Sequence, residues 1–164
     1  MKKAVVRQIM SVNTCSVSET EQAGAEFAAF LQREHISKSV VAMFGDIGAG
    51  KTAFVRGAVS LMVPGAIVQS PTYAIVREYR NDSACVYHFD MYRIEDEDSL
   101  ESIDFWGYLA ADGICFIEWS ENIVSFLPEK YYRVTLTAES RGTAVADPAG
   151  GAVRKIVVEQ YSTV

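Results

Sequence analysis

One segment of the sequence combines glycine, lysine and threonine at a spacing that suits the binding of a phosphate chain. It matches the pattern G-x-x-x-x-G-K-[ST] and consists of Gly45, Asp46, Ile47, Gly48, Ala49, Gly50, Lys51 and Thr52. Glycines permit backbone angles that turn successive N–H groups towards an anion, and a helix that starts there adds its positive end. Lys51 adds a charge for the β- and γ-phosphates, and the hydroxyl of Thr52 is a ligand for Mg²⁺. We therefore expect these eight residues to bind a nucleoside triphosphate with Mg²⁺.

Two acidic residues end strand-like runs and are candidates for the metal and the attacking water. A nucleotide site of this kind needs a carboxylate at the end of a neighbouring strand to hold Mg²⁺ directly or through water. Glu118 follows the apolar run 114–117, and Asp90 follows the alternating run 86–89. The continuous run favours Glu118 as metal ligand together with Thr52, and Asp90 as the group that orients or deprotonates the water. A surface or capping carboxylate at a strand end is the alternative for both.

The segment 70–73 (SPTY) is a candidate sensor of the γ-phosphate. In switch-type nucleotide hydrolases a stretch at this place often has that role. Pro71 stiffens the backbone, and Thr72 offers a hydroxyl. The spacing alone is equally compatible with a plain turn.

Motifs that are absent from the sequence restrict which ligands we expect. The Asn-Lys-x-Asp motif, which recognises guanine in GTPases, does not occur, and this favours ATP over GTP. The two histidines, His35 and His88, are isolated and lack metal-ligand spacing, so we interpret both as structural.

Hydrophobic patterning predicts the elements that would position these residues. The apolar run 39–44 before the glycine-rich loop is typical of a strand buried on both faces, as in a parallel sheet, and a helix pattern follows at 51–62. The other expected elements are a strand at 4–10, a helix from a capping box at Ser18 and Glu21 to about His35, an antiparallel hairpin at 73–80 and 84–90, an acidic helix at 95–103, a strand at 114–119, closing strands at 131–137 and 153–159, and an exposed loop at 138–152. The pattern predicts an α/β fold in one domain, 1–164.

Composition restricts the class of protein. The chain has 164 residues and a net charge of −6. The negative charge argues against direct binding of nucleic acid, because proteins that contact the phosphate backbone usually have more basic than acidic residues. Three cysteines without a CxxC pair favour a reducing compartment. Arg7 and Gln8 interrupt the apolar stretch of a would-be signal peptide, and the longest apolar run, 40–44, is too short to span a membrane. We expect a soluble cytoplasmic protein with no membrane partner.

Four segments together resemble the bacterial TsaE (formerly YjeE) family, small P-loop ATPases of tRNA threonylcarbamoyladenosine biosynthesis. They are GDIGAGKT at 45–52, SPTY at 70–73, VYHFDMYR at 86–93 and ICFIEW at 114–119. The resemblance covers about residues 16 to 141. It implies a P-loop NTPase sandwich, in which helices cover both faces of a mixed, mostly parallel central sheet.

The resemblance also implies roles for individual residues. Thr52 and Glu118 would coordinate Mg²⁺, while Asp90 and Thr72 would serve hydrolysis. The start of the first helix would lie near the adenine, which adds Thr20 to the ATP-binding residues, and Arg141 in the late loop would reach the nucleotide. Ala53 departs from the family, which often has a second threonine there, and this puts the turnover rate in doubt.

The partners that the resemblance implies are the TsaD and TsaB proteins. These transfer threonylcarbamoyl to adenosine 37 of tRNAs that read ANN codons. ATP hydrolysis, weak in the isolated family members, would reset that complex between turnovers. The tRNA would then contact this chain only indirectly.

Two other functions fit a P-loop. A small-molecule or nucleoside kinase would use Arg77, Arg80 or Arg93 to clamp phosphates, but the sequence has no arginine-rich run typical of a kinase lid. A nucleotide-gated binding module would bind ATP without meaningful turnover.

Overall fold

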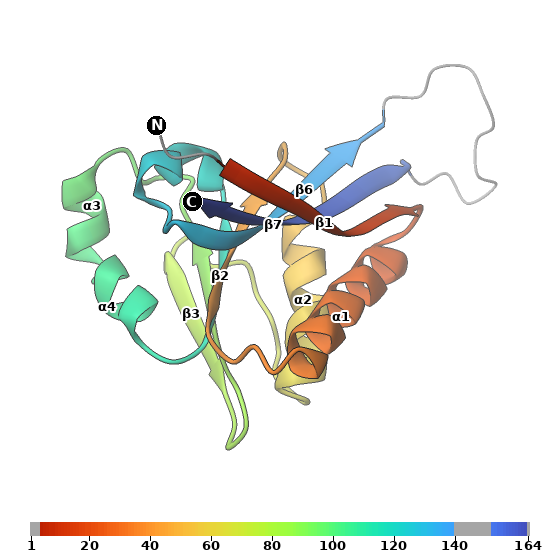
Figure 1. Cartoon of the computed structure of the whole chain (residues 1–164), viewed down its shortest axis with the longest axis horizontal. Helices are drawn as coiled ribbons and strands as arrows, with labels where there is room; N and C mark the ends of the chain where they lie inside the picture. The colour runs from red at the N-terminus through yellow and green to blue at the C-terminus, as the bar shows by residue number, and fades with distance from the viewer. Residues whose placement is uncertain (1–3, 140–151, 164) are drawn as a thin grey trace.

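The computed structural model describes residues 4–139 and 152–163 (Figure 1). Its elements in chain order are β1 (Ala4–Thr14), α1 (Val17–Arg33), β2 (Ser39–Phe44), α2 (Lys51–Met62), β3 (Val76–Arg80), β4 (Cys85–Asp90), α3 (Glu97–Ser102), α4 (Phe105–Ala110), β5 (Ile114–Glu118), the 3₁₀ helix η1 (Ser120–Phe126), β6 (Lys130–Ala138) and β7 (Arg154–Thr163). The strands form one sheet in the order β1-β7-β6-β2-β5-β4-β3.

The centre of the sheet is parallel and its margins are antiparallel. Strands β6, β2, β5 and β4 run in the same direction, whereas β3 on one side and β7 and β1 on the other run against their neighbours. Strand β5 is buried along its whole length and β2 along all but its first residue. This is the mixed, mostly parallel sheet that the continuous apolar runs predict.

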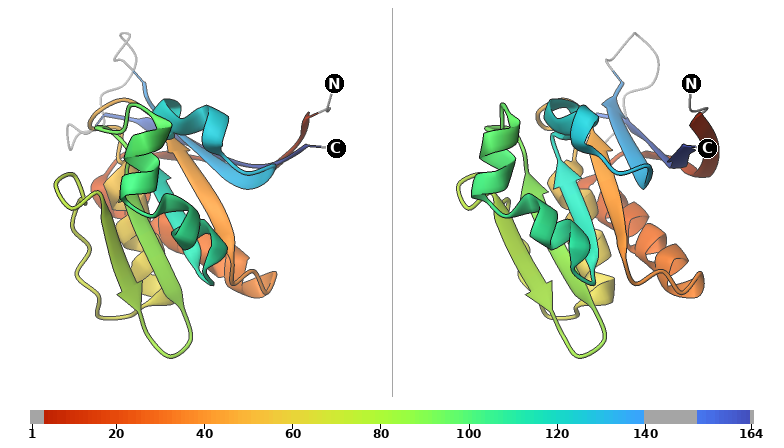
Figure 2. Two further views of the ribbon diagram at one scale, coloured as in Figure 1. Left: turned by 90° about the vertical axis from the view of Figure 1, so that its left-hand side faces the viewer. Right: turned by 60° about the vertical axis from the view of Figure 1, so that its left-hand side comes forward.

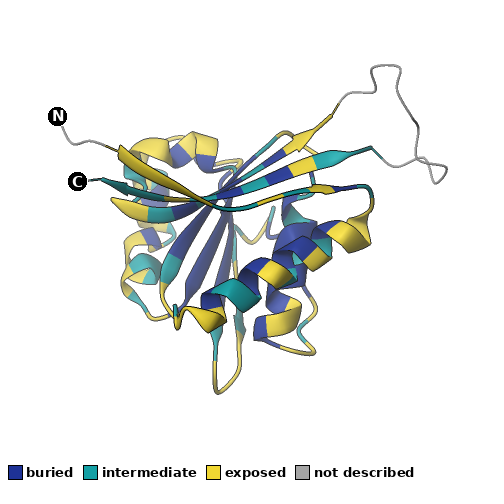
Figure 3. Cartoon of the chain, turned by 45° about the vertical axis from the view of Figure 1, so that its right-hand side comes forward, coloured by how far each residue is buried: buried dark blue, intermediate teal, exposed yellow. Residues whose placement is uncertain are grey.

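Helices cover both faces of the sheet, as the resemblance implied (Figure 2). Helices α1 and α2 bury Phe27 and Phe54 against one face, together with Val41 of β2. The short helices α3, α4 and η1 cover the other face, where Phe89 and Phe105 pack edge to face with ring centroids 5.7 Å apart. Figure 3 shows the central strands buried between these layers and β1 exposed along its edge.

Two glycines let α1 and α2 approach closely. A Cβ atom on Gly24 would lie 1.9 Å from the carbonyl oxygen of Phe54, and one on Gly57 would lie 1.7 Å from that of Glu21. Both distances are far below contact, so each helix uses a glycine to admit the backbone of the other. The arrangement fixes α2, and with it the loop that precedes α2, against α1.

Helix α1 starts two residues before the predicted capping box. The side chain of Ser16 accepts a hydrogen bond from the N–H of Glu19 (3.1 Å), and the Glu19 carboxylate accepts one from the N–H of Cys15 (2.7 Å). The prediction of Ser18 and Glu21 is therefore wrong, because the same S-x-x-E spacing occurs twice. Glu21 instead forms an ion pair with Arg56 of α2 at 2.8 Å.

Other expected elements differ at their ends. Strands β1 and β7 extend beyond the predicted 4–10 and 153–159, because they pair with each other along their length. Ala4 pairs with Thr163 at one end, and Thr14 pairs with Arg154 at the other. Helices α4 and η1 were not expected. Of the loop predicted at 138–152, Ala138 belongs to β6, and residues 140–151 lie outside the described residues. In the described part of the chain, no helix is long and apolar enough to cross a membrane.

Candidate nucleotide-binding site

The glycine-rich loop joins the end of β2 to the start of α2, which is the strand–loop–helix context that the motif requires. Gly50 has a φ of +103°, and Gly45 has a φ of +150° with the carbonyl oxygen of Leu136 only 2.5 Å from where a Cβ would stand. Glycine is required at both positions. The N–H of Gly45 donates to Glu121 Oε1 at 2.8 Å, which anchors the start of the loop to η1.

Lys51 lies in the loop with its ammonium group turned back onto the backbone. It donates hydrogen bonds to the carbonyl oxygens of Gly45 and of Asp46, the latter at 3.0 Å. Its Nζ also stands 4.1 Å from the centroid of the Trp119 ring. Burial lowers the pKa of Lys51, and the nearby carboxylates, Glu118 foremost, oppose that shift. The charge is thus held at the centre of the loop.

A cavity of about 430 Å³ opens over this loop. Residues 47–52 form its floor. Gly45 and Asp46 are not among its lining residues, and they contribute carbonyl oxygens to Lys51 instead. Ala53, at the place of the family's second threonine, also lines the cavity.

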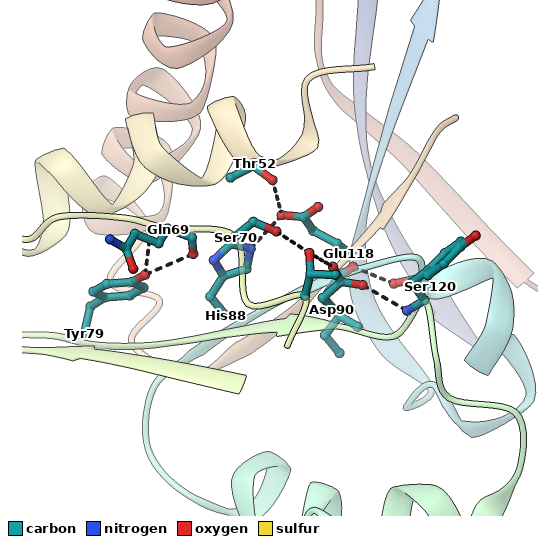
Figure 4. A network of polar contacts seen from close by, with 11 residues as sticks. Thr52, Gln69, Ser70, Tyr79, His88, Asp90, Glu118 and Ser120 are labelled. Carbon is teal, nitrogen blue, oxygen red and sulfur yellow. Dashed lines mark hydrogen bonds and ion pairs between the residues drawn. The ribbon is translucent and has the colours of Figure 1, made fainter. Parts of the chain in front are cut away.

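Three predicted catalytic residues, Asp90, Glu118 and Thr72, line this cavity. Figure 4 shows Asp90 and Glu118 close together in one polar network. Asp90 and Glu118 are register partners at the ends of β4 and β5, and they are 6% and 4% exposed. The hydroxyl of Thr52 donates to Glu118 Oε1 at 2.8 Å. The carboxyl ends of parallel strands meet at one edge of a sheet, and this brings residues distant in sequence together.

Asp90 is held by groups from two segments. Thr72 Oγ1 donates to Asp90 Oδ2 at 3.1 Å and lies 2.7 Å from the hydroxyl of Ser70, while the N–H of Tyr92 donates to Asp90 Oδ1 at 2.9 Å. Ser70 and Thr72 of the segment 70–73 therefore line the site, and the role of this segment as a sensor stays a prediction.

The oxygen donors fit a magnesium ion that is bound together with a phosphate chain. Thr52 and Glu118 present a hydroxyl and a carboxylate, the hard ligands that Mg²⁺ prefers. Among the described residues, no group of three or more His, Cys, Asp or Glu side chains could hold a metal ion. A cation here would thus depend on phosphate and water oxygens for its remaining ligands.

His88 also belongs to this network, although we interpreted it as structural from the sequence. Its side chain is fully buried, and Nε2 lies at hydrogen-bond distance, 2.7 Å, from the same Glu118 oxygen that Thr52 contacts. Its Nδ1 is buried and has no hydrogen-bond partner within residues 4–139 and 152–163. The spacing His88-x-Asp90 on a strand would have indicated that both side chains share one face.

The other side of the cavity holds residues that sequence reasoning missed or placed differently. Val17 and Arg154 line it, whereas Thr20 is not among the lining residues. Thr20 is buried, and its hydroxyl bonds to Thr14 Oγ1 at 2.9 Å. Its methyl group would lie 3.3 Å from a Cβ on Gly50, so Thr20 supports the loop from below. Arg141 lies outside the described residues.

Tyr92 and Trp119 complete the wall near Lys51, with ring centroids 5.0 Å apart. None of the arginines that a kinase would use, Arg77, Arg80 and Arg93, lines the cavity. Arg80 forms an ion pair with Glu78, and Arg93 bonds to the carbonyl oxygen of Thr72.

Comparison with known proteins agrees with this geometry. The model of the family "Threonylcarbamoyl adenosine biosynthesis protein TsaE" matches residues 14–145. The TsaE protein of Haemophilus influenzae is 42% identical over 107 residues, which cover 65% of this chain and 68% of that protein. The TsaE protein of Bacillus subtilis is 33% identical over 123 residues, covering 75% and 74%.

A solved structure resembles the whole arrangement. The crystal structure of Bacillus subtilis YdiB superposes with a TM-score of 0.67 at 25% identity, covering 97% of this chain and 86% of that one. The family match spans most of the chain, including the loop, the segment 70–73 and both strand-end carboxylates. The chain therefore belongs to the TsaE family of tRNA threonylcarbamoyladenosine biosynthesis proteins.

Proposed function

We propose that this chain binds and hydrolyses ATP with Mg²⁺, as an accessory protein required for threonylcarbamoylation of adenosine 37 in tRNAs that read ANN codons. The observation that carries the proposal is the meeting of Thr52, Glu118, Asp90 and Thr72 over the lysine of a phosphate loop, in one cavity. Phosphate transfer to water needs this set: backbone donors, a cation, a metal ligand and a group to position the water.

Thr52 and Glu118 would hold Mg²⁺, which neutralises charge on the β- and γ-phosphates when bound. Lys51 leaves the carbonyl oxygens of its own loop to contact those phosphates. The N–H groups of the loop and the start of α2 face the same anion. Residues 47–52, Gly45 and Asp46 act together as the ATP cradle, and Thr20 contributes by supporting Gly50.

Asp90 is suited to direct the attacking water. Both of its oxygens already accept a hydrogen bond, from Thr72 and from the N–H of Tyr92, so the carboxylate has a fixed orientation. The water oxygen attacks the γ-phosphorus, the bond from that phosphorus to the β–γ bridging oxygen breaks, and Asp90 accepts the proton of the water. ADP and phosphate are the products.

The partners in this proposal are proteins of the TsaD and TsaB type. A net charge of −6 is unfavourable for holding tRNA directly. We therefore assign the tRNA and the transfer chemistry to the partners, and the nucleotide switch to this chain.

A pair of variants tests the nucleotide chemistry. Lys51→Ala should weaken MgATP binding by about tenfold or more, because a charged hydrogen-bond donor is lost, while the exposed Lys155→Ala serves as a matched control with unchanged affinity. Asp90→Asn should bind MgATP within about twofold of wild type yet hydrolyse it about a hundredfold more slowly or worse, because general-base catalysis is lost. Calorimetry and phosphate release measure the two effects.

The outcomes separate the candidate functions. Unchanged affinity in Lys51→Ala would overturn the ATP cradle. Normal hydrolysis by Asp90→Asn would overturn the role of Asp90. Tight MgATP binding by the wild-type chain with no hydrolysis, even in the presence of its partners, would favour the nucleotide-gated binding module.

A further inference from the structure

Arg154 lies beside the phosphate loop and forms no ion pair with any residue that the structure describes. It is the first residue of β7 and lines the cavity. Its Cδ and Nε would lie 3.4 and 3.5 Å from a Cβ on Gly50, so the side chain runs along the loop. Its Nε is buried without a hydrogen-bond partner, and no described residue forms an ion pair with the guanidinium. A buried polar group of this kind usually has a partner, which points to a ligand.

The strand order places Arg154 on the side of the loop away from the acidic residues. The loop follows β2, and Glu118 and Asp90 end β5 and β4 on one side of that strand. Strand β6 lies on the other side, parallel to β2, and the final residue of β6, Ala138, is the register partner of Arg154. The cavity thus extends from the side of Asp90 and Glu118 to the side of the Arg154 guanidinium.

This geometry fixes which part of a nucleotide Arg154 can meet. The inference rests on the proposed function, which places the γ-phosphate at Asp90 and Glu118. The phosphate chain then lies over the loop, and the nucleoside extends towards Arg154. The γ-phosphate is the part of the ligand furthest from Arg154, so the guanidinium faces the nucleoside end, where its in-plane N–H groups can donate to ring or ribose acceptors while its face stacks.

The surroundings of Arg154 suit a flat aromatic ring. Val17 and Ile47 line the same cavity and are 54% and 84% exposed, so they offer apolar surface that a ring could cover. A guanidinium group is planar and stacks on aromatic faces, and such stacking contributes to the binding of bases.

We propose that Arg154 stacks on the purine ring of the bound nucleotide and gives the site its preference for a nucleoside triphosphate over bare tripolyphosphate. Tripolyphosphate carries the same phosphate chain without a base. The ratio of the two dissociation constants therefore isolates the contribution of the nucleoside.

The test compares the full chain with Arg154→Ala, Arg154→Lys and the charge-matched control Lys155→Ala. Calorimetry at physiological ionic strength measures the dissociation constants of Mg-ATP and Mg-tripolyphosphate. Arg154→Ala should weaken ATP binding by about tenfold or more and tripolyphosphate binding by less than about twofold. Arg154→Lys retains the charge but not the planar face, so it should also lose ATP preference. Lys155→Ala should change neither constant.

An equal loss of both ligands in Arg154→Ala would overturn the inference, because Arg154 would then act only as a general charge for phosphates. Unchanged ATP affinity in both Arg154 variants would overturn it as well. Failure of the proposed function has a different signature: the wild-type chain would bind neither ligand, or Lys51→Ala would bind both as tightly as wild type. If circular dichroism shows that Arg154→Ala does not fold, Arg154→Lys provides the test instead. Its ratio of dissociation constants for Mg-ATP and Mg-tripolyphosphate is then compared with that of wild type.

Discussion

A single oxygen of Glu118 receives two contacts, from the hydroxyl of Thr52 and from Nε2 of His88. Among the described residues, the other oxygen of this carboxylate has no hydrogen-bond partner. Side chains that hold a metal ligand in place commonly set its affinity for the metal. In the proposed function, the fully buried His88 would therefore position Glu118 and would not itself bind the metal.

The role of His88 can be separated from a general contribution to packing. We expect His88→Leu to raise the Mg²⁺ concentration needed for half-maximal ATP hydrolysis by about tenfold, because Glu118 loses its buried donor. His88→Gln offers an N–H near the position of Nε2 and should restore part of that loss. A Mg²⁺ titration of hydrolysis at saturating ATP measures both variants. Identical titration curves for His88→Leu and wild type would show that the contact does not position Glu118.

At the scale of elements, the site depends on how α2 is fixed against α1. Helix α2 begins at Lys51, so any displacement of the helix moves the ammonium group and the Thr52 hydroxyl with it. The close approach of the two helices at Gly24 and Gly57 is what holds α2 in place.

Substitution of Gly57 tests this packing. Alanine is favoured over glycine within a helix by about 1 kcal/mol, but its Cβ would stand 1.7 Å from the carbonyl oxygen of Glu21. The steric term should win, and Gly57→Ala should lower the free energy of unfolding by about 1–3 kcal/mol. Urea denaturation measures the change, with the exposed Ser60→Ala of the same helix as control, which should stay within about 0.5 kcal/mol of wild type. A Gly57→Ala chain as stable as wild type would show that α1 and α2 can separate freely.

Local patterns in the sequence predicted the elements better than their ends. The run 39–44, the loop and the helix 51–62 were found because periodicity and glycine spacing are local signals. The start of α1 was misplaced because S-x-x-E occurs twice within the six residues 16–21. Helix α4 and η1 were missed because short helices are defined by packing on the sheet, here through Phe105 and Ile123.

The candidate site likewise contains residues that the sequence could predict and residues that it could not. Asp90 and Glu118 could be predicted because they end strand-like runs, and a parallel sheet gathers such ends at one edge. Arg154 could not, because it reaches the cavity only through the pairing of β7 with β6. Strand order depends on contacts between distant segments, which one sequence does not display. His88 was visible as a residue, but its partner Glu118 is 30 positions away.

At the scale of the whole molecule, one sheet edge collects groups from nearly every part of the chain. The loop after β2 supplies Lys51, and the ends of β4 and β5 supply the carboxylates. Strand β7, which runs antiparallel to β6, supplies Arg154. The chain carries a net charge of −6, so these cations form a local site within an acidic protein. An acidic protein with a cationic cradle is suited to bind a nucleotide while partner proteins hold the tRNA.

We propose that ATP turnover in this cavity sustains repeated tRNA modification. The most direct measurement is the formation of threonylcarbamoyladenosine over time, with partner proteins of the TsaD and TsaB type, an ANN-decoding tRNA and ATP. We expect modification to stop after the first turnover when this chain is omitted or replaced by Lys51→Ala, and to continue when the wild-type chain is present. Continued modification over many turnovers without the chain would contradict the account.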